Sequence, residues 1–222
     1  MFKDFNLDPI LIDNVSRLGY VEPTPIQTSS IPPVMAGLDV VATAETGSGK
    51  TAAFLLPLYH RLLRSDRRGR IRGLILCPTR EIALQTHGEA QKIGRKTGLN
   101  STPIYGGVGF EPQFKALKRG MDIVVATPGR LLDHVGRQTV RLEDVEVLVI
   151  DEADRMLDMG FMPDIKRILG HLPAGRQTLL YSATMPHEIQ ALADKLMKEP
   201  TRVAIGRPAT PPGTVEQVLY HT

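Results

Sequence analysis

The chain has 222 residues, of which 42% are hydrophobic and 23% charged, and its formal net charge is +3. This length suits one α/β domain, or one domain with a fragment of another, and the composition is ordinary for a soluble globular protein. The single cysteine excludes an internal disulfide framework, and no apolar run reaches the roughly 18 residues that a membrane helix requires. Because the first residues also lack the apolar core of a signal peptide, we expect a cytoplasmic protein without membrane contact.

Short runs of β-branched and aliphatic residues alternate with longer helical patterns along the chain. This alternation predicts an α/β fold with a mostly parallel sheet and helices on both of its faces. Strands are predicted at 40–42, 73–77, 102–105, 122–126, 146–150 and 178–182, with a weaker one at 202–205. Helices are predicted at 50–63, 80–96, 111–118, 162–169 and 187–197.

The first strand leads into a glycine-rich segment that opens a helix, Ala44-Glu45-Thr46-Gly47-Ser48-Gly49-Lys50-Thr51. This is the Walker A spacing, with an alanine in the first glycine position. The backbone N–H groups of about Thr46 to Thr51 would hold phosphates together with the helix N-terminus. Lys50 would neutralise the β- and γ-phosphates of ATP, and the hydroxyl of Thr51 would ligate Mg²⁺. A glycine-rich turn without this function is the alternative, which the flanking strand and helix disfavour.

The basic charge is concentrated in one segment. Residues 64–72 contain five arginines and one acid, so their local net charge of +4 exceeds the +3 of the whole chain. We interpret the loop at 64–70 as a solvated, mobile connection and not as a dedicated RNA-contact patch.

Two acids follow the apolar run 147–150 directly, in the segment Asp151-Glu152-Ala153-Asp154. A rigid strand end can point such acids at one metal ion. Asp151 would hold Mg²⁺ through water, and Glu152 would orient or deprotonate the attacking water. Solvated helix caps are the alternative, which the nearby phosphate loop makes the weaker one.

A third polar segment, Ser182-Ala183-Thr184, follows the predicted strand at 178–182. Ligands of an open parallel sheet gather at the carboxyl ends of its strands. We therefore predict that Ser182 and Thr184 reach Asp151 and Asp154 as hydrogen-bond donors.

The end of the chain changes in composition. Residues 207–214 are proline-rich and apolar-poor, as in a linker, and residues 215–222 resume a strand-like pattern. We expect one domain at 1–206, followed at 207–222 by a linker and the first strand of a second domain.

Taken together, these segments resemble the N-terminal RecA-like domain of DEAD-box ATP-dependent RNA helicases, most closely the bacterial members, over about residues 2 to 206. The tetrapeptide at 151–154 gives that family its name. Further resemblances, in family order, are the Q motif at 19–20 and 23–27 with Phe2 upstream, motif Ia at 78–82 with Ile82 in place of leucine, the GG motif at 106–107, motif Ib at 127–130 and motif III at 182–184.

The resemblance implies a role for each matched residue. Tyr20 would stack on adenine, and the Gln27 amide would select adenine over guanine; ordinary packing at a helix end is the alternative for both. The implied nucleotide-binding set is Tyr20, Gln27, Thr46, Gly47, Ser48, Gly49, Lys50 and Thr51, and the implied catalytic set is Lys50, Asp151, Glu152, Asp154, Ser182 and Thr184. Positions implied to grip RNA phosphates and sugars independently of sequence are Pro78, Thr79, Arg80, Gly106, Gly107, Thr127, Gly129 and Arg130.

The resemblance implies ATP hydrolysis coupled to local unwinding of RNA, with Mg²⁺ as cofactor. The family's second RecA-like domain carries arginines that complete the ATP site, and this chain shows no such motif. We therefore expect the isolated chain to be a monomer that binds adenine nucleotide but does not unwind RNA. Two other functions stay open: an RNA clamp gated by nucleotide, and a different P-loop enzyme such as a small-molecule phosphotransferase.

Overall fold

The computed structural model describes residues 1–65 and 67–206, so the predicted linker and strand at 207–222 lie outside it. Seven parallel strands form one sheet in the order β3-β4-β2-β5-β6-β1-β7. Their bounds are β1 Val40–Thr43, β2 Gly73–Leu76, β3 Ser101–Ile104, β4 Ile123–Ala126, β5 Val147–Ile150, β6 Gln177–Ser182 and β7 Thr201–Ala204. The predicted α/β class is confirmed, and each predicted strand is present to within one or two residues.

Nine α-helices and one 3₁₀ helix accompany the strands in the described residues. They are η1 Phe2–Phe5, α1 Pro9–Arg17, α2 Pro25–Met35, α3 Lys50–Leu63, α4 Arg80–Ile93, α5 Phe110–Lys118, α6 Pro128–Gly136, α7 Ala153–Asp158, α8 Met162–Leu169 and α9 His187–Leu196. The sequence predicted α3, α4, α5, α8 and α9 but not the other five. Of the helices that the structure describes, none has the length and apolar content to cross a membrane.

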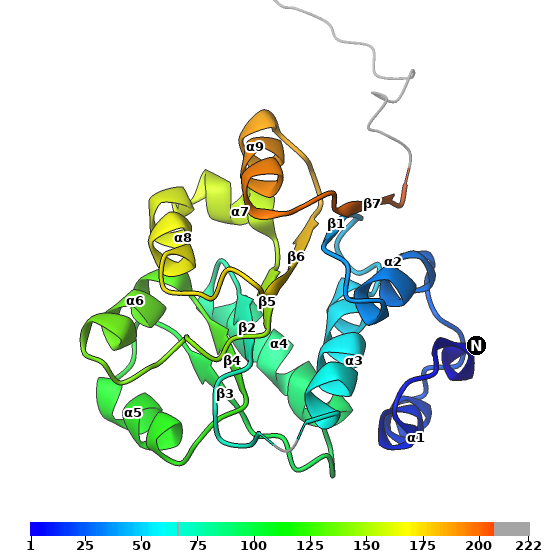
Figure 1. Cartoon of the computed structure of the whole chain (residues 1–222), viewed down its shortest axis with the longest axis horizontal. Helices are drawn as coiled ribbons and strands as arrows, with labels where there is room; N and C mark the ends of the chain where they lie inside the picture. Colours follow the sequence, from blue (N-terminus) through cyan, green and yellow to red (C-terminus); the bar gives the residue numbers. More distant parts are fainter. Residues whose placement is uncertain (66, 207–222) are drawn as a thin grey trace, which may run out of the picture.

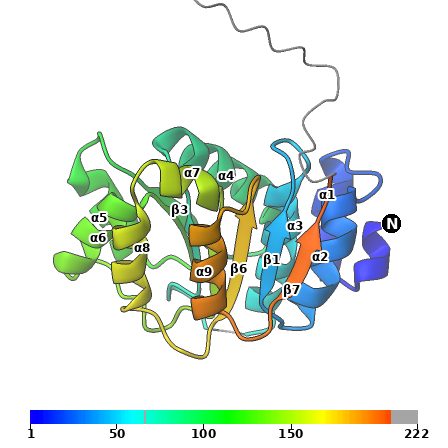
Figure 2. The same ribbon diagram turned by 90° about the horizontal axis from the view of Figure 1, so that it is seen from above.

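The sheet separates two hydrophobic layers, because successive side chains of a strand point to opposite faces. Val40 and Ala42 of β1 pack with α1, α2, α3 and α4, whereas Val41 packs on the other face with residues of α6, α8 and α9. Strands β2, β4 and β5 are buried on both faces, which explains their uninterrupted apolar sequences, whereas the edge strands β3 and β7 alternate between buried and more exposed residues. Figure 1 shows the sheet between these two groups of helices, and Figure 2 shows α9 beside β6 from a second direction.

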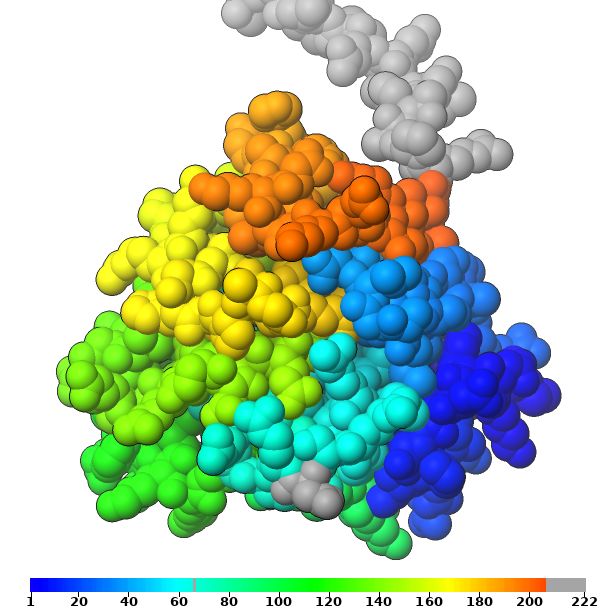
Figure 3. Space-filling model, in the orientation of Figure 1, coloured from blue at the N-terminus to red at the C-terminus, as the bar shows by residue number. Residues whose placement is uncertain are grey.

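The N-terminal segment packs against one flank of the domain, next to the segments that carry α2 and α3 (Figure 3). Helix α1 begins after Asp8, whose side chain accepts a hydrogen bond from the Ile10 N–H at 3.0 Å. The amide of Asn14, which is almost fully buried, donates to the carbonyls of Ile93 at 2.8 Å and Arg95 at 2.7 Å. Asn14 therefore fixes α1 to the end of α4.

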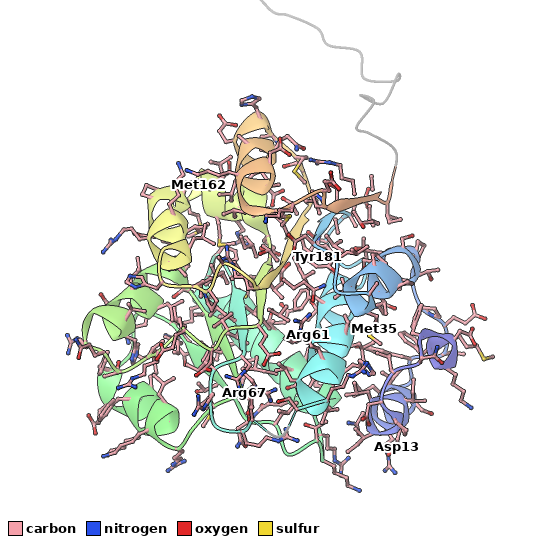
Figure 4. All side chains as sticks on the ribbon, in the orientation of Figure 1. Asp13, Met35, Arg61, Arg67, Met162 and Tyr181 are labelled. Atoms are coloured by element: carbon pink, nitrogen blue, oxygen red, sulfur yellow. The ribbon has the colours of Figure 1, made fainter. Side chains whose placement is uncertain are left out.

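The arginines of residues 64–72 lie in two environments. Arg67 and Arg70 both pair with Asp144, and Arg67 also pairs with Glu146. Arg72 is fully buried, donates to the Leu62 carbonyl and lies 3.8 Å from carboxylates of both Asp122 and Glu146. Figure 4 labels Arg61 and Arg67, which both pair with Glu146. The arginines at 64, 67, 68 and 70 are thus all exposed, in agreement with a solvated segment, whereas Arg72, which lies beyond that segment, is held inside the fold.

Candidate functional site

A cavity of about 520 Å³ opens where the loops after β1 and β5 meet α2, α4 and the N-terminal segment. Nine of the residues that the sequence assigned to nucleotide binding or catalysis line it. They are Tyr20, Gln27, Thr46, Gly47, Gly49, Lys50, Thr51, Asp151 and Glu152. Segments up to 132 residues apart in the chain therefore meet in one pocket, because parallel strands present all their carboxyl ends at one edge.

The phosphate loop takes its shape from two glycines in left-handed backbone conformations, Gly47 with φ of 82° and Gly49 with φ of 95°. A Cβ at Gly49 would lie 2.6 Å from Nε2 of Gln27, so a side chain there is excluded by space as well as by backbone strain. Lys50 is nearly buried, and its Nζ donates to the carbonyls of Ala44 at 2.6 Å and Glu45 at 3.2 Å. The lysine thus closes the loop on itself.

Gln27 is buried beneath this loop. Its Nε2 donates to the Gly49 carbonyl at 3.0 Å, and its Oε1 accepts from the Thr24 N–H at 3.0 Å. A side-chain amide has two hydrogens and two lone pairs, so one donor and one acceptor position remain for a ligand. Gln27 can therefore bind a base edge while it stays attached to the phosphate loop.

The acidic loop after β5 holds two carboxylates in different environments. Asp151 is only 5% exposed, and burial, with the negative charge of Glu152, raises its pKa to about 7 although Lys50 opposes this shift. Glu152 has a φ of 52°, an uncommon conformation for a non-glycine residue. Its Oε2 lies 3.4 Å from Arg155, a partner that the sequence did not indicate. A buried acid with a raised pKa is one that a cation would stabilise.

Asp154 does not line the cavity but joins the acidic loop to the end of β6. Its Oδ2 accepts from the N–H of Thr184 at 2.8 Å and from the Thr184 hydroxyl at 2.9 Å, and its own N–H donates to Ser182 Oγ at 3.1 Å. Burial would raise the pKa of Asp154, but the hydrogen bonds that its carboxylate accepts, first of all the two from Thr184, outweigh burial and lower the pKa. In the part of the chain that the structure describes, neither Ser182 nor Thr184 bonds Asp151, so that part of the prediction was wrong.

One wall of the cavity was missed by the sequence reading. It is a face of α4 formed by Ile82, Gln85, Thr86 and Glu89. These positions recur at three- and four-residue intervals and so lie on one side of the helix. The mixture of one apolar and three polar residues on this face is the signal that could have marked it.

The residues of this site fit a cation only together with phosphates. Across residues 1–65 and 67–206, no group of three or more His, Cys, Asp or Glu side chains has an arrangement that could hold a metal ion. Magnesium needs few protein ligands when phosphate oxygens and waters supply the others. The cavity lining carries one lysine and the four carboxylates Glu22, Glu89, Asp151 and Glu152, so a polyphosphate would require a cation beside it. The buried Ser48 Oγ, which has no partner among the described residues, is one unused polar group of the loop.

The residues implied to contact RNA gather at the same edge of the sheet, after the neighbouring strands β2, β3 and β4. Pro78 is buried, Thr79 caps α4, and Thr127 precedes α6. Arg80, Gly106 and Gly107 are exposed. Gly129 and Arg130 are partly exposed. The fold therefore brings all eight into one region, adjacent to the cavity through α4.

Two arginines of this region have partners within the fold. The Arg80 guanidinium lies 5.0 Å from the centre of the Tyr105 ring. Arg130 donates through both terminal nitrogens to the Val108 carbonyl, at 3.0 and 3.1 Å. These contacts fix the loop that contains Gly106 and Gly107, so Arg80 and Arg130 shape the surface as well as forming part of it.

Comparison with known proteins agrees with this geometry. The sequence model described as DEAD/DEAH box helicase matches residues 24–192. The chain is 46% identical over 209 residues to DEAD-box ATP-dependent RNA helicase 30 of Arabidopsis thaliana. This match covers 93% of this chain and 35% of that protein. It is 46% identical over 204 residues to DEAD-box ATP-dependent RNA helicase CshA of Bacillus subtilis, covering 92% of this chain and 41% of that protein. The chain thus spans about a third to two fifths of the length of these relatives.

A solved structure shares the fold. The crystal structure of a DEAD box protein from the hyperthermophile Methanococcus jannaschii superposes with a TM-score of 0.85 at 40% sequence identity, over 91% of this chain and 55% of that one. The predicted RecA-like fold and the predicted family are both confirmed. The family model spans most of the chain, and the fold assembles the matching motifs at one sheet edge. This chain therefore belongs to the DEAD/DEAH box helicase family.

Proposed function

We propose that this chain binds ATP with Mg²⁺ and hydrolyses it, as the nucleotide-binding domain of an ATP-dependent RNA helicase. The observation that carries the proposal is the single cavity in which the phosphate loop, Gln27 and the acidic loop meet. A small-molecule phosphotransferase would not need the separate RNA-facing region after β2, β3 and β4. The intact acids at 151 and 152 favour hydrolysis over a clamp that only binds nucleotide.

The phosphate loop would bind the polyphosphate through backbone N–H groups at the N-terminus of α3. Lys50 would leave the carbonyls of Ala44 and Glu45 and move its ammonium group to the β- and γ-phosphates. The exchange favours binding, because two neutral acceptors are replaced by charged ones. The loop that Lys50 closes is therefore opened by the ligand.

Asp151 and Thr51 would hold the magnesium ion, Asp151 through water. When bound, the ion would neutralise phosphate charge and so lower the repulsion from the cavity's carboxylates. Glu152 lies beside Asp151 at the cavity wall and would accept the proton of the attacking water or orient it. Its ion pair with Arg155 would fix the direction of the carboxylate.

The hydrogen bonds that Thr184 donates to Asp154, and the one that the Asp154 N–H donates to Ser182, would let the acidic loop and the end of β6 move as one unit. The RNA strand would run along the loops after β2, β3 and β4, where glycine N–H groups and hydroxyls face phosphates and sugars without reading bases. A second RecA-like domain would supply the groups that close over the γ-phosphate.

Calorimetry with residues 1–222 in the presence of Mg²⁺ tests the nucleotide assignment. ADP should bind at least about tenfold more tightly than GDP, because guanine carries the acceptor O6 where adenine carries its N6 donor and so leaves the free acceptor of Gln27 unpaired. Lys50→Ala should lower the affinity for ADP at least about tenfold, since it removes a charged hydrogen-bond donor. The matched control is Lys118→Ala, which removes an exposed lysine of α5 and should change nothing. Equal affinities for ADP and GDP would refute the adenine assignment, and an undiminished affinity in Lys50→Ala would refute the phosphate assignment.

A further inference from the structure

Glu89 lies on the cavity-facing side of α4, near the end of the helix. Its side chain is 26% exposed and accepts from Lys92 Nζ at 2.6 Å through Oε1. Its other oxygen, Oε2, lies 3.4 Å from the hydroxyl of Tyr20. The carboxylate therefore connects a helix-surface lysine to the aromatic residue at the base end of the cavity, across 69 residues of sequence.

The backbone of Tyr20 is fixed by the end of α1. Gly19 has a φ of 77°, its N–H donates to Ser16, and the N–H of Tyr20 donates to the Val15 carbonyl at 3.1 Å. This is the pattern with which a glycine ends a helix. This turn fixes the position of the Tyr20 backbone but leaves the side-chain torsions of Tyr20 undetermined.

Two contacts set the direction of the Tyr20 ring in the described structure. The ring packs beside buried Phe2, with 6.2 Å between ring centres and an angle of 32° between the planes. The hydroxyl at the far end of the ring meets Glu89. A phenol is protonated at neutral pH and so can donate this hydrogen bond, and burial and the negative charge of Glu89 raise the pKa of Tyr20 further.

We propose that Glu89 is a positioning residue of the nucleotide site, which holds the Tyr20 ring at the angle at which it stacks on the base. This inference rests on the proposed adenine-nucleotide binding and adds a residue to it. Helix α4 carries Thr79 and Arg80 at its other end, so one rigid helix joins the base-stacking residue to the region implied to contact RNA.

A simple surface ion pair between Glu89 and Lys92 is the competing interpretation, and such pairs contribute little. It predicts no effect of Glu89 on ligands. The fold offers a way to separate the two, because Asn14 already ties α1 to the end of α4 through hydrogen bonds to the carbonyls of Ile93 and, just beyond the helix, Arg95. Removal of the Glu89 carboxylate therefore leaves the helix packing intact while it frees the ring.

The test is calorimetry of residues 1–222 with Mg²⁺ and either ADP or inorganic tripolyphosphate, which has no base. Glu89→Ala should lower the affinity for ADP about 3- to 10-fold, the range of one hydrogen bond, and leave the affinity for tripolyphosphate unchanged. Tyr20→Phe should cause a loss of similar size, and the double variant should lose no more than either single one. Glu89→Gln keeps an acceptor and should retain most of the affinity, and Lys92→Ala should bind both ligands like the wild type.

Each other outcome has a definite meaning. An unchanged ADP affinity in Glu89→Ala overturns the inference, and so do additive losses in the double variant, because Glu89 would then contact the nucleotide itself. Equal weakening of both ligands with a lower melting temperature assigns Glu89 a purely structural role and also overturns it. A wild-type chain that binds tripolyphosphate but not ADP refutes the proposed adenine site itself, before any variant is compared.

Discussion

His134 of α6 is a fully buried histidine that no part of the proposed chemistry uses. Its ring stacks on Phe110 with 4.0 Å between the centres, and its nitrogens lie 2.9 Å from Thr139 Oγ1 and 3.3 Å from Gln113 Oε1. Burial, and then the positive charge of Arg130, lowers its pKa from 6.5 to about 4. The folded chain therefore keeps this histidine neutral where the unfolded chain protonates it.

Acidification should destabilise the domain through His134. Because the folded-state pKa lies below the unfolded one, the contribution is complete above about pH 6.5 and is lost as the pH falls towards about 4, by up to about 3 kcal/mol in the free energy of unfolding. His134→Gln keeps polar groups at this position without a titrating one. Urea unfolding of both proteins at pH 7.5, 6.0 and 5.0 should show the wild type losing more stability than the variant. Parallel losses would show that His134 is not responsible.

At the scale of single residues, the sequence predicts those that belong to local motifs. Lys50 and Asp151 stand at recognisable spacings after strands, and both line the cavity. Glu89 and Arg155 could not be predicted, because each acts through a contact with another residue and neither belongs to a motif. The bond between Tyr20 and Glu89 in particular depends on how α1 packs on α4. Tertiary packing decides such pairs, and a single sequence does not display it.

At the scale of elements, the contact between α3 and α4 matters because α3 begins at the phosphate loop. Buried Tyr59 of α3 donates to the Ala90 carbonyl at 2.7 Å, and its ring lies against Gly94 at the end of α4. A Cβ at Gly94 would overlap the Tyr59 ring, whereas a Cβ at Gly88, within the same helix, would meet nothing within 4 Å. Steric contact with Tyr59 therefore requires glycine at position 94, whereas no neighbouring atom requires it at position 88.

Gly94→Ala and Gly88→Ala should have effects of opposite sign on stability. The first forces Tyr59 or α4 to move and should cost about 1–3 kcal/mol, as overpacking does. The second adds a better helix former without a clash and should stabilise by about 0.5–1 kcal/mol. Thermal and urea unfolding measure both. If both substitutions stabilise the domain, the helices have room to separate and the close approach of Tyr59 is not required.

Three of the five helices that the sequence missed share a physical cause. Helices α1, α2 and α6 each begin with a proline, and α2 also contains Pro32 and Pro33. Proline inside a pattern argues against a helix, but at the first turn it is compatible with one because no N–H is needed there. Helix α7 has only six residues and shows too few turns for a periodic pattern. The central strands β2, β4 and β5 were predicted well because burial on both faces makes each an apolar run.

At the scale of the whole molecule, one sheet edge carries both proposed ligand regions. The nucleotide cavity lies at the ends of β1 and β5, and the region implied to contact RNA lies at the ends of β2, β3 and β4. Both open to solvent on the described domain. In the cavity lining, Lys50 is the sole basic side chain among the residues that the structure describes. Charge that develops on the γ-phosphate during hydrolysis would therefore face one lysine, several carboxylates and water.

A polypeptide of residues 1–222 should consequently bind ADP but show no appreciable RNA-stimulated ATP hydrolysis and no strand separation. Stabilisation of the transition state is weak where water has access, and a missing arginine finger costs about 10³–10⁵ in the rate of related phosphoryl transfers. A chimera should recover RNA-stimulated ATP hydrolysis. In it, the part of this chain that matches the Bacillus subtilis relative, 92% of the chain, replaces the corresponding part of that relative. Glu152→Gln should abolish that activity in the chimera, because the variant keeps the side-chain shape but cannot accept the proton of the attacking water. Robust stimulation by RNA of residues 1–222 alone, at a dilution that prevents self-association, would contradict this account, since one open half-site would then suffice.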